Sequence, residues 1–161
     1  MELIEYIDRG GILVNILIAL NIIGFTIMLF KLFILFFAKR NLESTANKIV
    51  SNFINKDLVF NEIKSEVKKL EFGLNTIKII ASISPLIGLL GTVIGVLEAF
   101  DSISKLGLGD PSIFSHGISV ALITTVAGMI VAIPHYIGYN YFIGTIDNIE
   151  LKLTNKVLSK I

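Results

Sequence analysis

The residues best placed to do chemistry are two threonines, Thr92 and Thr125, each of which lies inside a long uncharged stretch. A hydroxyl group donates and accepts hydrogen bonds. In a surrounding of low dielectric it lowers the cost of burying an ionised carboxyl group. The two threonines are therefore expected to offer hydroxyl groups inside a pore or partner groove formed by two spans. Ordinary packing of helices within one subunit is the open alternative.

Other kinds of chemistry find little support. The chain has no cysteine, and it lacks the P-loop, HExxH and GxSxG patterns, so we expect no enzyme activity, no cofactor and no metal site. A formal net charge of +1 argues against nucleic-acid binding. Glu98, His116 and His135 fall near the ends of the uncharged stretches, where solvation and packing explain them.

The composition is that of an integral membrane protein. Hydrophobic residues make up 53% of the 161, charged residues 17%, and the mean hydropathy is +0.79. Residues 10–30, 79–97 and 111–146 contain no Asp, Glu, Lys or Arg. A helix needs about 20 apolar residues to cross a bilayer. The sequence therefore predicts three spans and an all-α fold.

The basic residues predict the orientation. Of the 14 Lys and Arg residues, eight lie within 39–78 and three follow Gly144, which places both regions on the cytoplasmic side. Lys31 is expected to snorkel at the end of the first span. The expected segments are the outer N-terminus 1–10, span one with its cytoplasmic exit 11–38, a cytoplasmic helical segment 39–78, span two 79–100, an outer loop 101–116, span three 117–140 and a cytoplasmic helical tail 141–161.

Two spans are predicted to extend beyond the membrane as long helices. Apolar and small residues recur every three or four positions from Phe60 to Glu98, which indicates one continuous helix over about 58–100. A similar pattern continues from span three to near the C-terminus. Residues 107–112, Gly-Leu-Gly-Asp-Pro-Ser, form the one clear turn cluster.

Small residues and prolines set the expected packing. Gly88, Gly91 and Gly95 share one face of span two, and Gly128 lies in span three, which favours close helix contact. Counting 1.5 Å per residue puts Thr92 and Thr125 at one depth, within about 5 Å of mid-membrane. Pro85 and Pro134 fall together near the inner edge, where they could kink both helices.

Two motifs carry a resemblance to a known family. SPLIGLLGTVIGVLEAF (84–100) and ALITTVAGMIVAIPHYIGYNYF (121–142) resemble the MotA/TolQ/ExbB family of proton-channel and motor subunits, nearest to its ExbB/TolQ branch. The resemblance covers nearly the whole chain. It implies a bacterial inner-membrane protein that forms a ring of five around a dimeric ExbD- or TolR-like single-span partner. Thr92 and Thr125 would then line the ring near a proton-carrying aspartate of that partner.

The resemblance also implies what the proton flow would drive. Proton flow would energise a TonB- or TolA-like transducer. One departure is Val120, which stands where many such proteins have a glutamate five residues before the threonine of span three. A structural scaffold without ion conduction and a self-sufficient ion channel remain as alternatives. The absence of a central charge in every span counts against the channel.

The expected topology can be tested by labelling, because the chain has no native cysteine. Ser51→Cys lies in the predicted cytoplasmic segment and Ser104→Cys in the predicted outer loop. An impermeant maleimide applied to intact cells should label the Ser104→Cys variant alone. Labelling of Ser51→Cys but not of Ser104→Cys would reverse the orientation.

Overall fold

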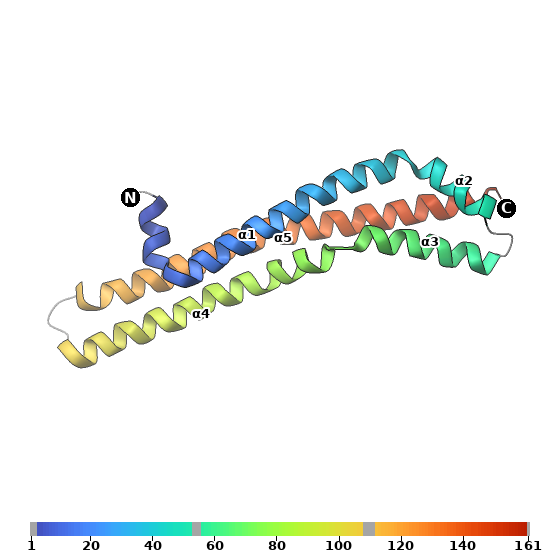
Figure 1. The fold of residues 1–161 in the computed structure, drawn as a ribbon. Coiled ribbons are helices and arrows are strands. Elements are labelled where there is room, and N and C mark those ends of the chain that lie inside the picture. Colours follow the sequence, from blue (N-terminus) through green and yellow to red (C-terminus); the bar gives the residue numbers. More distant parts are fainter. Residues whose placement is uncertain (1–2, 53–55, 108–111, 161) are drawn as a thin grey trace. The chain divides into compact units, whose positions relative to one another are not determined.

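The computed structural model describes residues 3–52, 56–107 and 112–160. Within these ranges the chain forms five α-helices, as Figure 1 shows. The helices are α1 (Leu3–Arg40), α2 (Leu42–Asn52), α3 (Lys56–Glu71), α4 (Leu74–Leu106) and α5 (Ser112–Leu158). The all-α prediction is confirmed.

Three of these helices are long and apolar enough to cross a membrane. The candidate spans are Ile7–Arg40, Leu74–Leu106 and Phe114–Leu158. They correspond to the three spans expected from the uncharged stretches. Helix extends into the expected outer loop from both ends, so among its described residues only Gly107 is not helical; residues 108–111 of the turn cluster lie outside the described ranges.

The chain divides into two compact units, to which α1, α4 and α5 each contribute. The first unit comprises Met1–Phe25 and Lys78–Tyr136, and the second comprises Thr26–Ile77 and Ile137–Ile161. In the first unit, the buried side chains of Leu17, Ile80 and Val131 join α1, α4 and α5. The first unit therefore has a small apolar core of its own.

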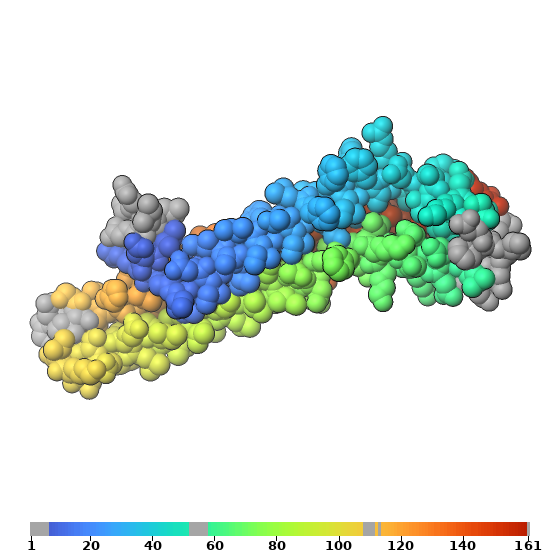
Figure 2. Space-filling view, in the orientation of Figure 1, coloured from blue at the N-terminus to red at the C-terminus, as the bar shows by residue number. Residues whose placement is uncertain are grey.

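The span helices leave most of their apolar side chains uncovered. Only 17% of the most apolar stretch of α1 is buried, against 33% for the corresponding stretches of α4 and α5. The side chains of α1, drawn in blue, lie open on the face shown in Figure 2. Helix α1 also departs from helical geometry at Gly11, whose φ of 60° suits glycine.

Glycines let the backbones of α4 and α5 meet in the first unit. A Cβ added at Gly88 would lie 2.9 Å from the carbonyl oxygen of Thr124, and one at Gly95 would lie 2.8 Å from the Ala121 nitrogen. On the opposite helix, a Cβ at Gly128 would lie 2.6 Å from Ser84 O. Real side chains do not fit such gaps, so these glycines set the helix separation.

The expectation of one continuous helix over 58–100 is wrong. Helix α3 ends at Glu71 and α4 begins at Leu74, with Gly73 at a φ of 83° between them. This left-handed conformation ends helices and is open to glycine at little cost. The apolar stripe hides the break, because Val67 before it and Leu74 after it are both buried.

Lys31 does not snorkel in this structure, contrary to expectation. Its side chain in α1 is only 2% exposed, and its Nζ donates a hydrogen bond of 2.6 Å to the carbonyl oxygen of Leu70. Carbonyls in the last turn of a helix have no intrahelical donor. A cation there is also attracted by the partial negative charge of the helix C-terminus. Lys31 therefore caps α3 where the chain breaks.

The second unit has the larger core. Its buried apolar side chains come from all five helices and include Leu35, Ala46, Ile49, Val59, Ile63, Val67, Leu74, Ile77, Phe142, Ile146, Ile149, Leu153 and Val157. The α5 members recur every three or four residues, which confirms that span three continues as one helix to near the C-terminus.

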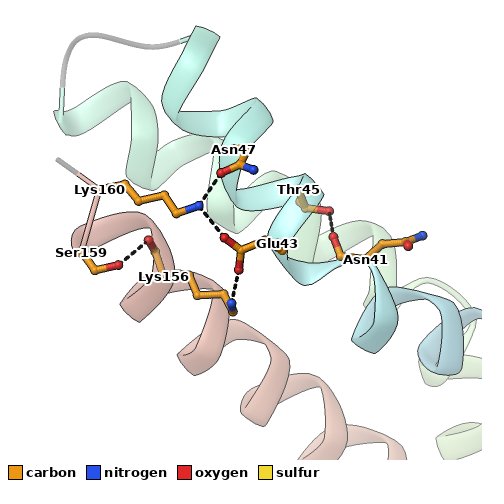
Figure 3. Close-up of polar contacts among 7 residues, drawn as sticks. All are labelled: Asn41, Glu43, Thr45, Asn47, Lys156, Ser159 and Lys160. Carbon is orange, nitrogen blue, oxygen red and sulfur yellow. Dashed lines mark hydrogen bonds and ion pairs between the residues drawn. The ribbon is translucent and has the colours of Figure 1, made fainter.

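An ion-pair cluster joins α2 to the end of α5 in this unit. Glu43, in the first turn of α2, pairs with Lys156 and, at 2.5 Å, with Lys160 (Figure 3). Lys160 also donates to Asn47 Oδ1. Hydrogen bonds from the two lysines, followed by their charges, lower the pKa of Glu43 to about 2. The carboxylate is thus kept ionised in the folded chain.

The close contact of α4 and α5 predicts that Gly95→Ala destabilises the chain. The new methyl group would overlap the backbone of α5, which cannot turn aside as a side chain can. We expect a loss of about 1–3 kcal/mol of stability, seen as a lower midpoint of thermal unfolding in detergent. Gly144→Ala in α5 is the matched control, since nothing lies within 4 Å of its new Cβ. Equal midpoints for the two variants would contradict the packing account.

The Glu43 cluster predicts a pH dependence. The folded pKa of about 2 lies below the ordinary 4.5, so the stabilisation is present above about pH 4.5 and is lost as pH falls toward 2. The unfolding midpoint of Glu43→Gln should therefore fall less than that of the wild type over this range. Asp147→Asn, which removes an exposed carboxylate from α5 of the same unit, serves as the control. A wild-type pH profile in Glu43→Gln would overturn this assignment.

Candidate functional site: a threonine pair between two membrane-spanning helices

The hydroxyl groups of Thr92 and Thr125 meet in the first unit. Thr92 on α4 and Thr125 on α5 hydrogen-bond to each other through their Oγ1 atoms. Their direct contact shows that the two residues lie side by side on α4 and α5, while their depth near mid-membrane stays a prediction. Both side chains are partly buried, so the pair lies at the edge of the α4–α5 contact.

The two hydroxyls share the same backbone acceptors. Thr92 Oγ1 lies 3.2 Å from Ala121 O and 3.4 Å from Gly88 O, and Thr125 Oγ1 lies 3.1 Å and 3.4 Å from the same atoms. Gly88 and Ala121 each precede a threonine of the pair by four residues, the usual position for a helical hydroxyl to bond back to its own helix. The pair is therefore held by both helices at once.

Counting protons shows what the pair can offer. Each hydroxyl has one proton to donate and two lone pairs to accept. If one threonine donates to the other, the second donates to Gly88 O or Ala121 O, and both protons are used. Free lone pairs remain on the oxygens. In this arrangement the pair can accept a hydrogen bond from a protonated group. To donate a hydrogen bond to an anion, one of the two hydroxyls must first release the acceptor to which it is bonded.

Thr124 is a packing residue that the sequence reading passed over. Its side chain is fully buried, and its Oγ1 bonds to Val120 O and Ala121 O of its own helix, both at 3.0 Å. A Cβ at Gly91 would overlap this side chain, so Thr124 fills the gap that Gly91 leaves. Adjacent threonines are ambiguous in a sequence because either can face the neighbouring helix.

The remaining candidate residues lie apart from the pair. Helix α4 continues through Pro85 and α5 through Pro134, and the kinks expected there remain predictions. Glu98 and His116 are exposed, whereas His135 is fully buried. Among the described residues, no group of three His, Cys, Asp or Glu side chains is arranged to hold a metal ion.

Comparison with known proteins identifies the family. The family model described as the MotA/TolQ/ExbB proton channel family matches residues 33–155. A putative biopolymer transport protein ExbB homolog of Methanothermobacter thermautotrophicus is 42% identical over 56% of this chain and 34% of its own length. The Tol-Pal system protein TolQ of Pseudomonas aeruginosa is 38% identical over 50% of this chain and 35% of its own.

A third relative is the biopolymer transport protein ExbB of Aquifex aeolicus, which is 41% identical over 47% of this chain and 51% of its own length. The chain thus spans between about a third and a half of these relatives. The family match covers most of the chain and includes both helices of the threonine pair. The chain belongs to the MotA/TolQ/ExbB proton channel family.

Proposed function

We propose that the chain is a subunit of a motor driven by the proton-motive force. Copies of it form a ring, a pentamer by family resemblance, around a dimeric ExbD- or TolR-like single-span partner, and the ring energises a TonB- or TolA-like transducer. The observation that carries this proposal is the Thr92–Thr125 pair, two hydroxyls held together between uncharged helices. Placing polar side chains among apolar ones in a membrane costs free energy. Polar residues are therefore rare there, and they mark either helix packing or the path of an ion.

Uncovered apolar surface supports assembly into a ring. Large side chains of α4 stay exposed in the isolated chain, among them Leu86, Leu89 and Leu97, each more than half exposed. Facing helices of neighbouring subunits or of a partner would cover them. Helix α1, which is the least buried of the spans, would then face lipid. The ring, its subunit number and this arrangement are parts of the proposal.

The pair suits an acid that changes its protonation state. A protonated carboxyl group on a partner helix donates to a free lone pair of Thr92 or Thr125 without disturbing the pair. An ionised carboxylate needs a donor, so one hydroxyl turns from a backbone carbonyl toward it. Because Gly88 O and Ala121 O are shared acceptors, the remaining hydroxyl keeps a partner in either state. The threonines thereby reduce the cost of moving the acid between its two states.

The proposed location is the bacterial inner membrane, with the N-terminus in the periplasm and residues 39–78 and 141–161 in the cytoplasm. The distribution of Lys and Arg supports this orientation. Cytoplasmic placement puts the second unit's helices α2 and α3 on the inner side.

Dependence on a partner separates a motor subunit from a scaffold. We would reconstitute the chain into liposomes alone and together with an ExbD- or TolR-like single-span protein that carries an aspartate in its span. Proton flux under an imposed potential, read with a pH-sensitive dye, should appear only in the second preparation. Flux in neither preparation, with the two proteins shown to associate, would support the scaffold instead, and flux without a partner would support a self-sufficient channel.

The role of the threonines predicts that the Thr92→Val, Thr125→Val double variant assembles with its partner yet conducts poorly. Valine keeps the shape and removes the hydroxyl. We expect proton flux in the reconstituted complex to fall about tenfold or more, because hydrogen bonds to a charged group are lost. Thr124→Val is the matched control, since that hydroxyl bonds within its own helix. Wild-type flux in the double variant, at normal assembly, would remove the proposed role of both residues.

A further inference from the structure

A buried histidine lies where α1 meets α5 in the first unit. His135 is fully buried, its Nδ1 lies 2.7 Å from the carbonyl oxygen of Val131, and its ring meets that of Phe25 edge-on at a centroid distance of 5.2 Å. Opposite it on α1 is Gly24, where an added Cβ would overlap Nε2. The absence of a side chain at Gly24 lets the Nε2 edge of the imidazole reach the backbone of α1.

The contact to Val131 determines which nitrogen carries the proton. A carbonyl oxygen only accepts hydrogen bonds, so Nδ1 must be the donor and the neutral ring has a bare Nε2. This Nε2 is buried and has no hydrogen-bond partner among the residues that the structure describes. A buried acceptor left in this state costs free energy.

A second unpartnered acceptor lies one helical turn away. Asn21 Oδ1 is also buried without a hydrogen bond. Asn21 and Gly24 are three residues apart and so share a face of α1, separated by about 4.5 Å along the helix axis. Beside Asn21 is a largely apolar groove of about 590 Å³, which α1 and α5 line. The Asn21 side chain therefore borders open space and is free to change the orientation of its amide.

Two acceptors cannot bond to each other, but one added proton makes them a donor and an acceptor. We propose that His135 and Asn21 form a proton-binding site within the membrane-spanning helices. A hydronium ion transfers its proton to Nε2 and leaves as water, and the new Nε2–H donates to Asn21 Oδ1. The bond from Nδ1 to Val131 O is kept in both states, so the ring binds and releases a proton without losing its anchor.

When His135 is neutral, the Asn21 amide can donate a hydrogen bond to the ring instead of accepting one from it. Half a turn about its last torsion exchanges Oδ1 and Nδ2, and Nδ2–H then donates to the bare Nε2. One proton thus sets the orientation of the Asn21 amide. The site is separate from the Thr92–Thr125 pair and does not depend on the function proposed above.

Charges on the surrounding helices do not satisfy the ring. Helix α1 has no charged residue between Arg9 and Lys31. The other titratable side chains that α4 and α5 contribute to the first unit are exposed: Lys78, Glu98, Asp101, Lys105, His116 and Tyr136. Stabilisation of the imidazolium must therefore come from hydrogen bonds: Val131 O already accepts from Nδ1, and in this proposal Asn21 Oδ1 is the second acceptor.

Nitrogen NMR of the full chain, labelled with ¹⁵N-histidine in lipid nanodiscs, tests the site directly. The sequence has 2 histidines, and His116→Gln leaves only the signals of His135. We expect a neutral ring protonated at Nδ1 in alkaline buffer, and a ring that carries protons on both Nδ1 and Nε2 once the buffer is sufficiently acidic. A ring that stays bare at Nε2 throughout, or that carries its neutral proton on Nε2, overturns the proposal.

Asn21→Leu tests the acceptor. Loss of a hydrogen bond to the charged ring should lower the ratio of protonated to neutral His135 about tenfold at a given pH. Asn15→Leu is the matched control, an exposed asparagine of the same helix, and it should leave the ratio unchanged. Equal titration of His135 in Asn21→Leu and in the wild type would exclude Asn21 from the site. The wild-type titration decides the matter if Asn21→Leu fails to fold.

Discussion

The contact between the backbones of α4 and α5 is the constraint on which the first unit depends. Gly88, Gly95 and Gly128 leave no room for a Cβ, so the two helices approach more closely than side chains would allow. At that separation a threonine on one helix reaches the carbonyls of the other. The shared acceptors of Thr92 and Thr125 are thus a consequence of glycine packing, and a wider spacing would leave each hydroxyl bonded only to its own helix.

Two buried polar side chains of α5 lie opposite glycines of a neighbouring helix. Gly91 admits Thr124, and Gly24 admits the imidazole of His135. In hydrocarbon a polar atom must find its partner within the protein. The threonines satisfy one another, whereas His135 Nε2 and Asn21 Oδ1 remain unpartnered. The threonine pair is thus already hydrogen-bonded and can accept a further group through its free lone pairs, whereas the other two acceptors still lack a donor.

The second unit is held together by a larger apolar core and by side chains that act on helix ends. Lys31 caps the last turn of α3, and Glu43 at the start of α2 pairs with two lysines near the end of α5. In both contacts a charged side chain lies at the helix end that carries partial charge of the opposite sign, where it stabilises the helix. Both contacts lie next to helix ends, while the stripe of Val67, Leu74 and Ile77 fills the interior.

Periodicity and charge by themselves determined the all-α class and the three candidate spans, and they predicted that Thr92 and Thr125 lie at one level, because helix rise and the cost of burying charge are local properties. The break at Gly73 was hidden, since the apolar stripe continues across it and glycine is also common in packed helices. Only the tertiary structure decided that Lys31 turns inward, that Thr124 fills the gap at Gly91 and that His135 is buried. Each of these depends on which side chain lies opposite on another helix, and one sequence contains no record of that pairing.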